Sequence, residues 1–218
     1  ATYPFGRGGF EVSKLEEATA KRYLPAAELS KLKSATANNP QCEYARKLFL
    51  FSYYCYGISF IDMAMLTAAH IKQMEDGDYI VYKRQKIKRQ KGVKPISIKI
   101  TPAIRQLIGS LQAASPTVDD FLLPVVTRSG YTGERLYMHI RTRYSKYQKY
   151  LRLLAEELGI DFHLTSYVSR HTAAMTLQRN NIPREVISQM LGHADLETTN
   201  IYLDSFDNEV INEAAKVL

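Results

Sequence analysis

Apolar residues recur along most of this chain at the spacing of α-helices. Residues 42–56 are apolar on nearly every side, which predicts a buried central helix. Residues 134–158 carry an apolar stripe from Tyr137 through Tyr144 to Leu158, and we interpret this stripe as core packing. Further helical patterns cover residues 24–35, 60–66, 101–111, 167–177, 183–191 and 208–218.

Alternating apolar and polar residues predict one small antiparallel sheet. Residues 79–82 form the first predicted strand, and residues 96–100 form the second, with isoleucine at every other position. A strongly basic segment lies between them, so the two strands are expected to form a hairpin with a cationic tip.

Several residues mark where the predicted helices begin and end. Gly57 is expected to end or bend the central helix, and Gly192 to end the helix of residues 183–191. Pro183 suits the first position of that helix, where the missing N–H costs nothing. Thr165 or Ser166 is expected to cap the helix that follows.

Composition narrows the class of protein. The chain has 218 residues, 45% of them hydrophobic, which is enough for a substantial core. Its net charge of +7 suits a polyanionic partner. Cys42 and Cys55 lie in an apolar helix and are expected to be buried free thiols. No membrane-spanning run or signal peptide is apparent, so the cytoplasm is the expected compartment.

Three short motifs follow one another near the C-terminal end. They are Arg170-His171, then Leu191-Gly192-His193, and then Tyr202, nine positions (202 − 193) after His193. The ordered set resembles the tyrosine recombinase (phage integrase) family. The sequence of residues 163–202 resembles that of integrases of Bacteroides-type mobile elements. The resemblance implies a mainly α (α+β) fold, an integrase-like DNA breaking-rejoining catalytic domain with a helical core and a small antiparallel sheet.

The chemistry of DNA strand transfer explains the residue types. Attack of a phenolate on a phosphodiester adds charge to the phosphate oxygens, and guanidinium groups bind these oxygens bidentately. A tyrosine nucleophile conserves the bond energy in a 3′-phosphotyrosyl link, so the strand can be rejoined. The resemblance makes Tyr202 the nucleophile and Arg170 a phosphate clamp supported by His193. We expect no cofactor and no metal, because cationic side chains neutralise the charge.

The chain departs from the family's pattern in two places. The family's first catalytic arginine follows a glycine such as Gly57, but here Tyr56 or Ser59 stands in its place. A histidine that the family places three residues before Arg170 is replaced by Tyr167, whose phenol can still donate a hydrogen bond.

The basic hairpin offers substitutes for the missing groups. The family carries a catalytic lysine there, and Lys86 matches it as the general acid. Arg84 lies two residues earlier, so on a strand it would face the same side as Lys86. We expect Arg84 to supply the missing guanidinium.

Other expectations concern partners and domains. Double-stranded DNA is the expected partner, with self-association as a tetramer on two duplexes through exchange of the C-terminal helix. Residues 1–12 are interpreted as a linker remnant and residues 13–218 as the catalytic domain, with the family's N-terminal core-binding domain absent. The residues expected to contact the DNA backbone are Lys83, Lys88, Arg89, Lys91, Arg141 and Arg143.

Two alternatives remain open at this stage. One is a DNA-binding module of the same fold with weak or no chemistry, because the first arginine is missing. The other is a type IB topoisomerase-like enzyme, which would relax supercoiled DNA as a monomer.

Overall fold

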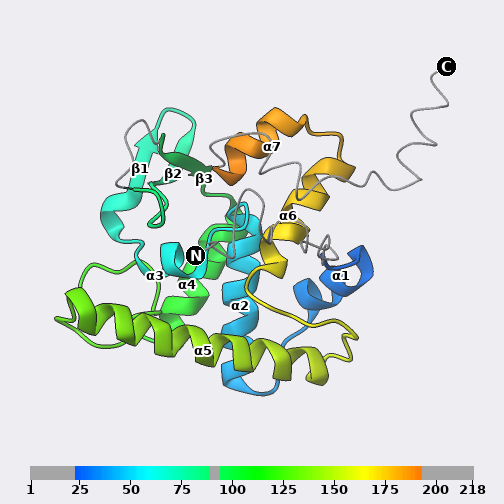
Figure 1. The fold of residues 1–218 in the computed structure, drawn as a ribbon, viewed down its shortest axis with the longest axis horizontal. Coiled ribbons are helices and arrows are strands. Elements are labelled where there is room, and N and C mark those ends of the chain that lie inside the picture. The colour runs from blue at the N-terminus through cyan, green and yellow to red at the C-terminus, as the bar shows by residue number, and fades with distance from the viewer. Residues whose placement is uncertain (1–22, 89–93, 193–218) are drawn as a thin grey trace, which may run out of the picture.

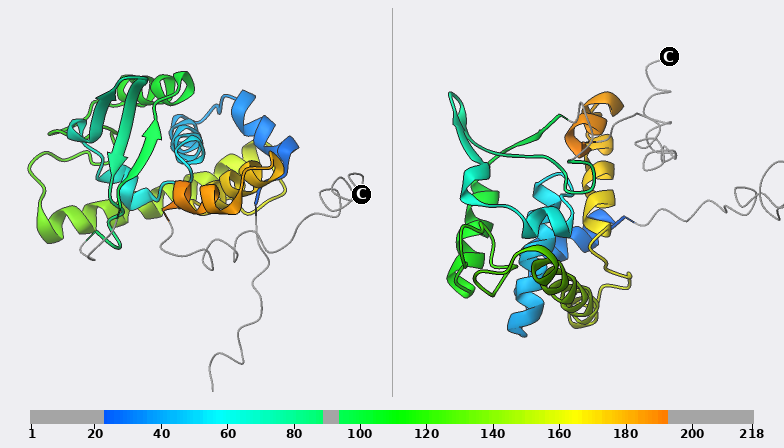
Figure 2. Two further views of the ribbon diagram at one scale, coloured as in Figure 1. Left: turned by 90° about the horizontal axis from the view of Figure 1, so that it is seen from above. Right: turned by 60° about the vertical axis from the view of Figure 1, so that its left-hand side comes forward.

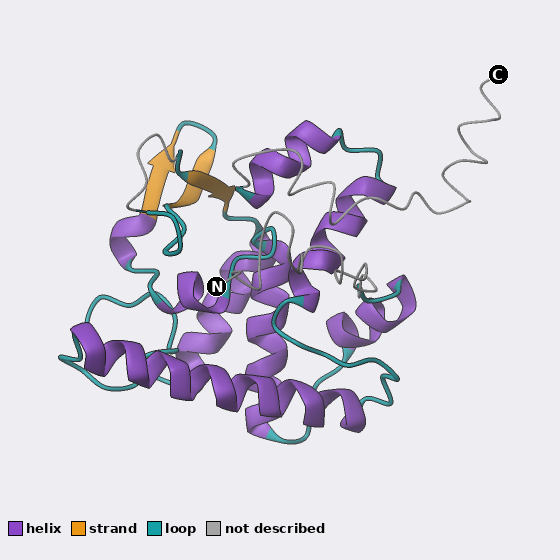
Figure 3. Ribbon diagram, viewed as in Figure 1, coloured by secondary structure: helices purple, strands orange, loops and turns teal. Residues whose placement is uncertain are grey.

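The computed structural model describes residues 23–88 and 94–192. Helices dominate it, and the only sheet among these residues is small (Figure 3). The helices are α1 (Ala26–Ser34), α2 (Pro40–Tyr54), α3 (Phe60–Ala64), α4 (Pro102–Ala114), α5 (Gly133–Glu157), α6 (Val168–Arg179) and α7 (Arg184–Leu191). The strands are β1 (Ile71–Met74), β2 (Gly77–Tyr82) and β3 (Ile96–Lys99), and a 3-10 helix spans Ala68–His70. The predicted fold class is confirmed.

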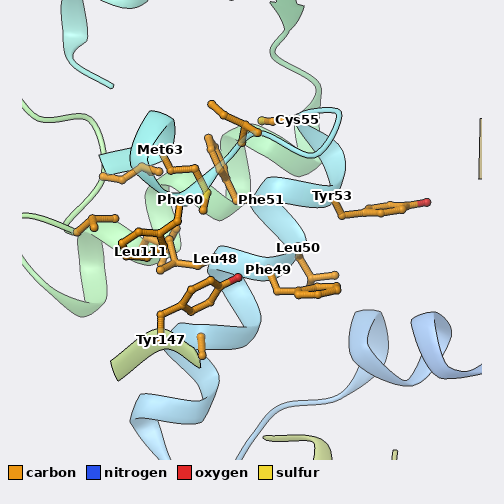
Figure 4. Close-up of a cluster of buried hydrophobic side chains, with 14 of the residues drawn as sticks. Leu48, Phe49, Leu50, Phe51, Tyr53, Cys55, Phe60, Met63, Leu111 and Tyr147 are labelled. Atoms are coloured by element: carbon orange, nitrogen blue, oxygen red, sulfur yellow. The ribbon is translucent and has the colours of Figure 1, made fainter. Parts of the chain in front are cut away.

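Helix α2 is the centre of the molecule, as its sequence predicts. It packs against α4, α5 and α6, with α5 running along one side (Figure 1). Figure 4 shows Leu48 and Phe51 of α2 meeting Met63 and Leu111 from neighbouring helices in the core. Cys42 and Cys55 are buried free thiols, as expected.

Local signals set the start of α2 two residues earlier than predicted. The side chain of Asn39 accepts a hydrogen bond from the backbone N–H of Gln41 at 2.8 Å, and Pro40 begins the helix. Asparagine satisfies an unpaired N–H of the first turn, and proline has no N–H to lose. The Asn38-Asn39-Pro40 segment therefore separates α1 from α2 and also starts α2.

The sheet contains one strand that the sequence pattern did not reveal. Its order is β1-β2-β3, antiparallel throughout, with Ile80 opposite both Ile71 and Ile98. Strands β2 and β3 were predicted and are confirmed. Strand β1 is an edge strand with mostly exposed side chains, so its sequence shows no alternation and only its pairing with β2 defines it.

Two predicted helix starts are wrong. Pro183 is the cap before α7 and not its first helical residue. Neither Thr165 nor Ser166 caps α6, which begins after Tyr167 without a side-chain cap. The hydroxyl of Ser166 instead lies 3.1 Å from the hydroxyl of Tyr144, and the backbone N–H of Ser166 donates to Gln148.

Candidate functional site

The tight turn after α2 packs directly against the start of α6. Tyr56 and Gly57 both have positive φ angles, 56° and 71°. A Cβ atom on Gly57 would lie 2.4 Å from the Cα atom of Arg170, closer than any real contact. Only glycine fits here, because α6 packs directly on the backbone of the turn.

Arg170 is held in place by two backbone carbonyls. Its side chain is buried, with the residue only 4% exposed. Nη1 donates to the carbonyl of Gly57 at 3.1 Å, and Nη2 donates to the carbonyl of Leu191 at 2.6 Å. Leu191 is the last residue of α7, so its carbonyl has no partner within the helix. Arg170 therefore links the turn after α2 to the end of α7.

Arg84 reaches the same end of α7 from the sheet. Its Nη1 lies 3.4 Å from the carbonyl oxygen of Gly192, which caps α7 in the left-handed conformation. A Cβ atom on Gly192 would lie 2.3 Å from Cδ1 of Ile96 on β3. The two arginines thus meet adjacent carbonyls at the negative end of the α7 dipole, which attracts both cations.

Arg84 and Arg170 line one pocket of about 430 Å³, which we call the Arg84–Arg170 pocket. Its walls come from the α2–α3 connection, α3, α5, and the start of α6. The other lining residues are Gly57, Ile58, Ser59, Phe60, Ile61, Tyr137, Ile140, Arg141, Tyr144, Ser166 and Tyr167. The pocket therefore combines guanidinium groups with aromatic and aliphatic surface.

Asp62 fixes the start of the hairpin that carries Arg84. The residue is 3% exposed, and its two carboxylate oxygens accept hydrogen bonds from the backbone N–H of Gln85 at 2.7 Å and from the hydroxyl of Ser59 at 2.6 Å. Asp62 therefore has a structural hydrogen-bonding role. Burial, together with the Asp62 carboxylate, raises the pKa of Tyr82, and nearby Arg170 and Arg84 only partly oppose this. Tyr82 is therefore a neutral core residue.

Lys86 lies apart from the pocket. Strand β2 ends at Tyr82, and residues 85–88 form a turn in which Lys86 and Lys88 are exposed. The expectation that Arg84 and Lys86 share one side of a strand is therefore wrong. Of the two, only Arg84 lines the pocket. The assignment of Lys86 as the general acid remains a prediction.

Ser59, Tyr56 and Tyr167 stand where the family has catalytic residues, and they differ in whether they line the pocket. Ser59 lines the pocket, but its hydroxyl is engaged with Asp62, and Tyr56 is not among the lining residues. Tyr167 lines the pocket and is 53% exposed. Its ring stands edge-on to that of His171, with centroids 5.0 Å apart.

The four described cations that were expected to contact DNA fall into three groups. Arg141 lines the Arg84–Arg170 pocket. Arg143 does not, because its guanidinium lies over the ring of Tyr44, 5.7 Å from the centroid. Lys83 and Lys88 are exposed beside the sheet and line a separate open hollow.

Several predicted residues lie outside the part of the chain that the structure describes. They are His193, Tyr202, Arg89 and Lys91, together with the segments 1–12 and 208–218. Within the described residues, no group of three His, Cys, Asp or Glu side chains could hold a metal ion. None of the helices described there has the length and apolar character needed to span a membrane.

The sequence pattern missed the role of two tyrosines on α5. Tyr137 and Tyr144 were expected in the core, but they are 60% and 38% exposed and line the pocket. The available signal was their spacing with Arg141: positions 137, 141 and 144 correspond to i, i+4 and i+7, which places them on one face of a helix. The core stripe is confirmed only for its other positions, such as Ile140 and Tyr147.

Comparison with known proteins places this architecture in a family. A model of the phage integrase family matches residues 22–209. Tyrosine recombinase XerD of Halalkalibacterium halodurans is 43% identical over 54 residues, which cover 25% of this chain and 18% of that protein. XerD of Brucella abortus is 31% identical over 111 residues, covering 50% of this chain and 32% of that protein. The matched part of this chain thus spans a third or less of the length of these curated relatives.

Solved structures share the fold. The XerA recombinase superposes with a TM-score of 0.62 at 22% identity, covering 89% of this chain and 64% of that one. The Tn1549 transposon integrase, in complex with transposon right end DNA, also gives 0.62 at 13% identity, covering 96% of this chain and 70% of that one. XerH bound to its difH substrate gives 0.57 at 19% identity, covering 88% of this chain and 53% of that one.

Proposed function

The chain belongs to the phage integrase family, and we propose that it acts as a site-specific DNA recombinase that cleaves and rejoins strands through a covalent 3′-phosphotyrosyl intermediate. One observation carries this proposal. Arg84 and Arg170 line one pocket, and each meets a backbone carbonyl at the end of α7. In the sequence, His193 follows the α7 cap directly, and Tyr202 comes nine positions later (202 − 193).

The pocket's two arginines suit the charge that develops during strand cleavage. Tyr202 loses its phenolic proton to solvent and attacks the phosphorus as a phenolate. The bond to the 5′-oxygen breaks, and the strand's 3′-phosphate stays on the tyrosine. Arg170 and Arg84 bind the phosphate oxygens that gain charge. Because backbone carbonyls already orient both side chains, little reorganisation is needed when that charge appears.

Other residues complete the proposed reaction. Lys86 protonates the leaving 5′-oxygen, once the exposed turn that carries it has moved toward the bound DNA. His193 supports the phosphate, and Tyr167 donates a hydrogen bond to it. Rejoining runs the same steps in reverse, with a 5′-hydroxyl attacking the phosphotyrosine.

DNA is the proposed partner. The XerH and Tn1549 integrase structures are complexes with DNA, and the present chain carries a net charge of +7. Lys83 and Lys88 are exposed beside the sheet, where they suit contacts to backbone phosphates. For the assembly, we propose a tetramer on two duplexes in which the segment 208–218 packs on a neighbouring protomer.

The test uses a nicked suicide substrate, which traps covalent protein–DNA complexes on a denaturing gel. The full-length protein and its recombination site are used, and wild type is compared with Tyr202→Phe and Arg84→Ala. Arg105→Ala is the matched control, since Arg105 forms only an exposed ion pair with Asp78. We expect a covalent band in wild type and Arg105→Ala, none in Tyr202→Phe, and a loss of roughly 100-fold or more in Arg84→Ala.

Three contrary results would each reject a different part of the proposal. A band that survives Tyr202→Phe would reject the nucleophile. Full activity in Arg84→Ala would reject Arg84 as the second clamp. Tight DNA binding without any covalent band in wild type would reduce the protein to a binding module.

A further inference from the structure

The Arg84–Arg170 pocket extends beyond what a phosphate requires. A phosphate is bound through charge and hydrogen bonds, which its guanidinium groups supply. The wall formed by α5 adds Tyr137 and Tyr144, and the buried residues Ile140 and Phe60 also line the pocket. A tyrosine hydroxyl can donate to a phosphate, but the faces of its ring cannot. This side of the pocket therefore also fits a flat, partly apolar group.

We propose that the α5 side of the pocket binds one unpaired nucleobase of the DNA strand whose phosphate the arginines hold. This inference rests on the proposed function, because it takes DNA as the ligand. A nucleotide has the same two chemical halves as the pocket: an anionic phosphate and a base with a π face. Tyrosine rings and arginine guanidinium planes are the side chains on which bases stack.

The spacing on α5 puts the required groups on one face. Tyr137, Arg141 and Tyr144 occupy positions i, i+4 and i+7 of the helix. All three line the pocket, and both tyrosines expose a large part of their surface. Tyr147, on the inner face of the same helix, is buried by contrast.

Tyr144 is fixed before any ligand arrives. Its ring centroid lies 5.3 Å from that of Phe60, and Phe60 stacks on buried Tyr147 at 5.2 Å with an interplanar angle of 21°. The Tyr144 hydroxyl lies 3.1 Å from that of Ser166 at the other end. This column of three rings runs from the core to the pocket, so a stacked base would immobilise little additional side-chain freedom.

The energetics select the kind of base that can bind. Extruding a base from an intact duplex costs stacking and pairing energy, whereas a base that is already single-stranded has lost them beforehand. The subsite therefore favours positions whose base is already unpaired.

The test compares two short single-stranded probes by fluorescence anisotropy: a thymidine oligonucleotide and an abasic oligonucleotide of the same length and phosphate count. We expect the thymidine probe to bind about 10-fold more tightly, the ratio typical of one stacked base. Tyr137→Ala should bring the ratio close to one, and Tyr137→Phe should retain it. Met138→Ala is the matched control, because Met138 is exposed on the same helix but does not line the pocket.

Equal affinity for the two probes, or an unchanged ratio in Tyr137→Ala, would overturn the proposal. A further contrary result would be that a labelled peptide of residues 208–218 binds the wild type but not Tyr137→Ala, while the two DNA probes bind equally. The pocket would then belong to a protein segment. None of these measurements needs cleavage. A base preference without a covalent band in the suicide-substrate assay would reject the proposed activity alone. A covalent band without a base preference would reject the subsite alone.

Discussion

Gly57 is the residue on which the position of Arg170 depends most directly. Its backbone occupies the left-handed region, and the missing side chain leaves room for the backbone of α6. Gly192 has a similar role on the opposite side of the site, where Ile96 and Arg84 approach. Two glycines thus allow three segments distant in sequence to meet around two arginines.

We predict that Gly57→Ala destabilises the protein and displaces Arg170. Alanine in the left-handed region costs roughly 1–2 kcal/mol, and the clash with Arg170 adds roughly 1–3 kcal/mol. Urea unfolding measures this loss, and the suicide-substrate assay measures the effect on cleavage. Gly130→Ala is the control, since its φ is +72° but a Cβ atom there would meet nothing within 4 Å. Equal losses in the two variants would show that the close approach to Arg170 is unimportant.

At the scale of elements, α3 holds the hairpin that carries Arg84, and α5 holds the loop that precedes α5 in the sequence. Asp62 connects α3 to Gln85, the residue after Arg84. His139 on α5 accepts a hydrogen bond from the backbone N–H of Thr127 at 3.2 Å. Neither connection is local in sequence, and each can be broken by a single substitution.

We predict that Asp62→Ala lowers the free energy of unfolding by about 1–3 kcal/mol, because the Gln85 N–H and the Ser59 hydroxyl lose their acceptor. Cleavage should fall as well, since Arg84 is no longer anchored. Asp78→Ala serves as control, because its exposed ion pair with Arg105 is worth at most about 1 kcal/mol. If Asp62→Ala cleaves DNA as well as wild type does, the hydrogen bond from Gln85 to Asp62 is not needed for the function of Arg84.

A second prediction concerns pH. Burial, followed by the charges of Arg143, Arg128 and Lys146, lowers the pKa of His139 below its usual value. The folded state therefore binds fewer protons than the unfolded state, and stability is lost as pH falls through about 6.5, the value of an unperturbed histidine. An imidazolium cannot accept the Thr127 hydrogen bond, which gives the same sign.

The test compares Tm at pH 7.5 and pH 5.5. We expect His139→Gln, whose amide oxygen can still accept, to lose less Tm on acidification than wild type. The exposed residue His163, changed to Gln, controls for the removal of a histidine elsewhere. An identical drop in wild type and His139→Gln would contradict the prediction.

At the scale of the whole molecule, basic residues are spread over several surfaces, and some of them already have acidic partners. Figure 2 (left view) places the sheet at one end of the molecule and α1 at the other. Lys83 and Lys88 lie beside the sheet, whereas Lys31 on α1 pairs with Glu28. The net charge by itself does not distinguish these surfaces.

We predict that replacing both Lys83 and Lys88 with Ala weakens binding to duplex DNA about equally for all sequences. The slope of log K against log salt concentration should become shallower by roughly 1 for each DNA phosphate that the protein no longer neutralises. Binding isotherms at several salt concentrations measure this slope. Lys31→Ala should leave it unchanged, and an unchanged slope in the double variant would place the DNA elsewhere.

Within the described residues, the sequence determined the helices, two of the three strands and the helix-ending glycines, and it also revealed the ordered motif from Arg170 to Tyr202. These features depend on residues that are near one another in the chain, so periodicity and spacing reveal them. The substitution of Arg84 for a missing guanidinium was a hypothesis from the sequence, and its place in the pocket with Arg170 supports it. The strand argument used for Lys86 was wrong, because β2 ends two residues before Arg84.

Only the tertiary structure decided which side chains share the pocket. Arg141 and Arg143 are two residues apart and equally basic, yet one lines the pocket and the other covers Tyr44. The apolar stripe of α5 is wider than the core it faces, so Tyr137 is left at the surface although its spacing matches that of core residues. A pattern along one helix gives the direction of each side chain relative to its neighbours on that helix, but the partner that meets each direction is set by the packing of segments far apart in the sequence.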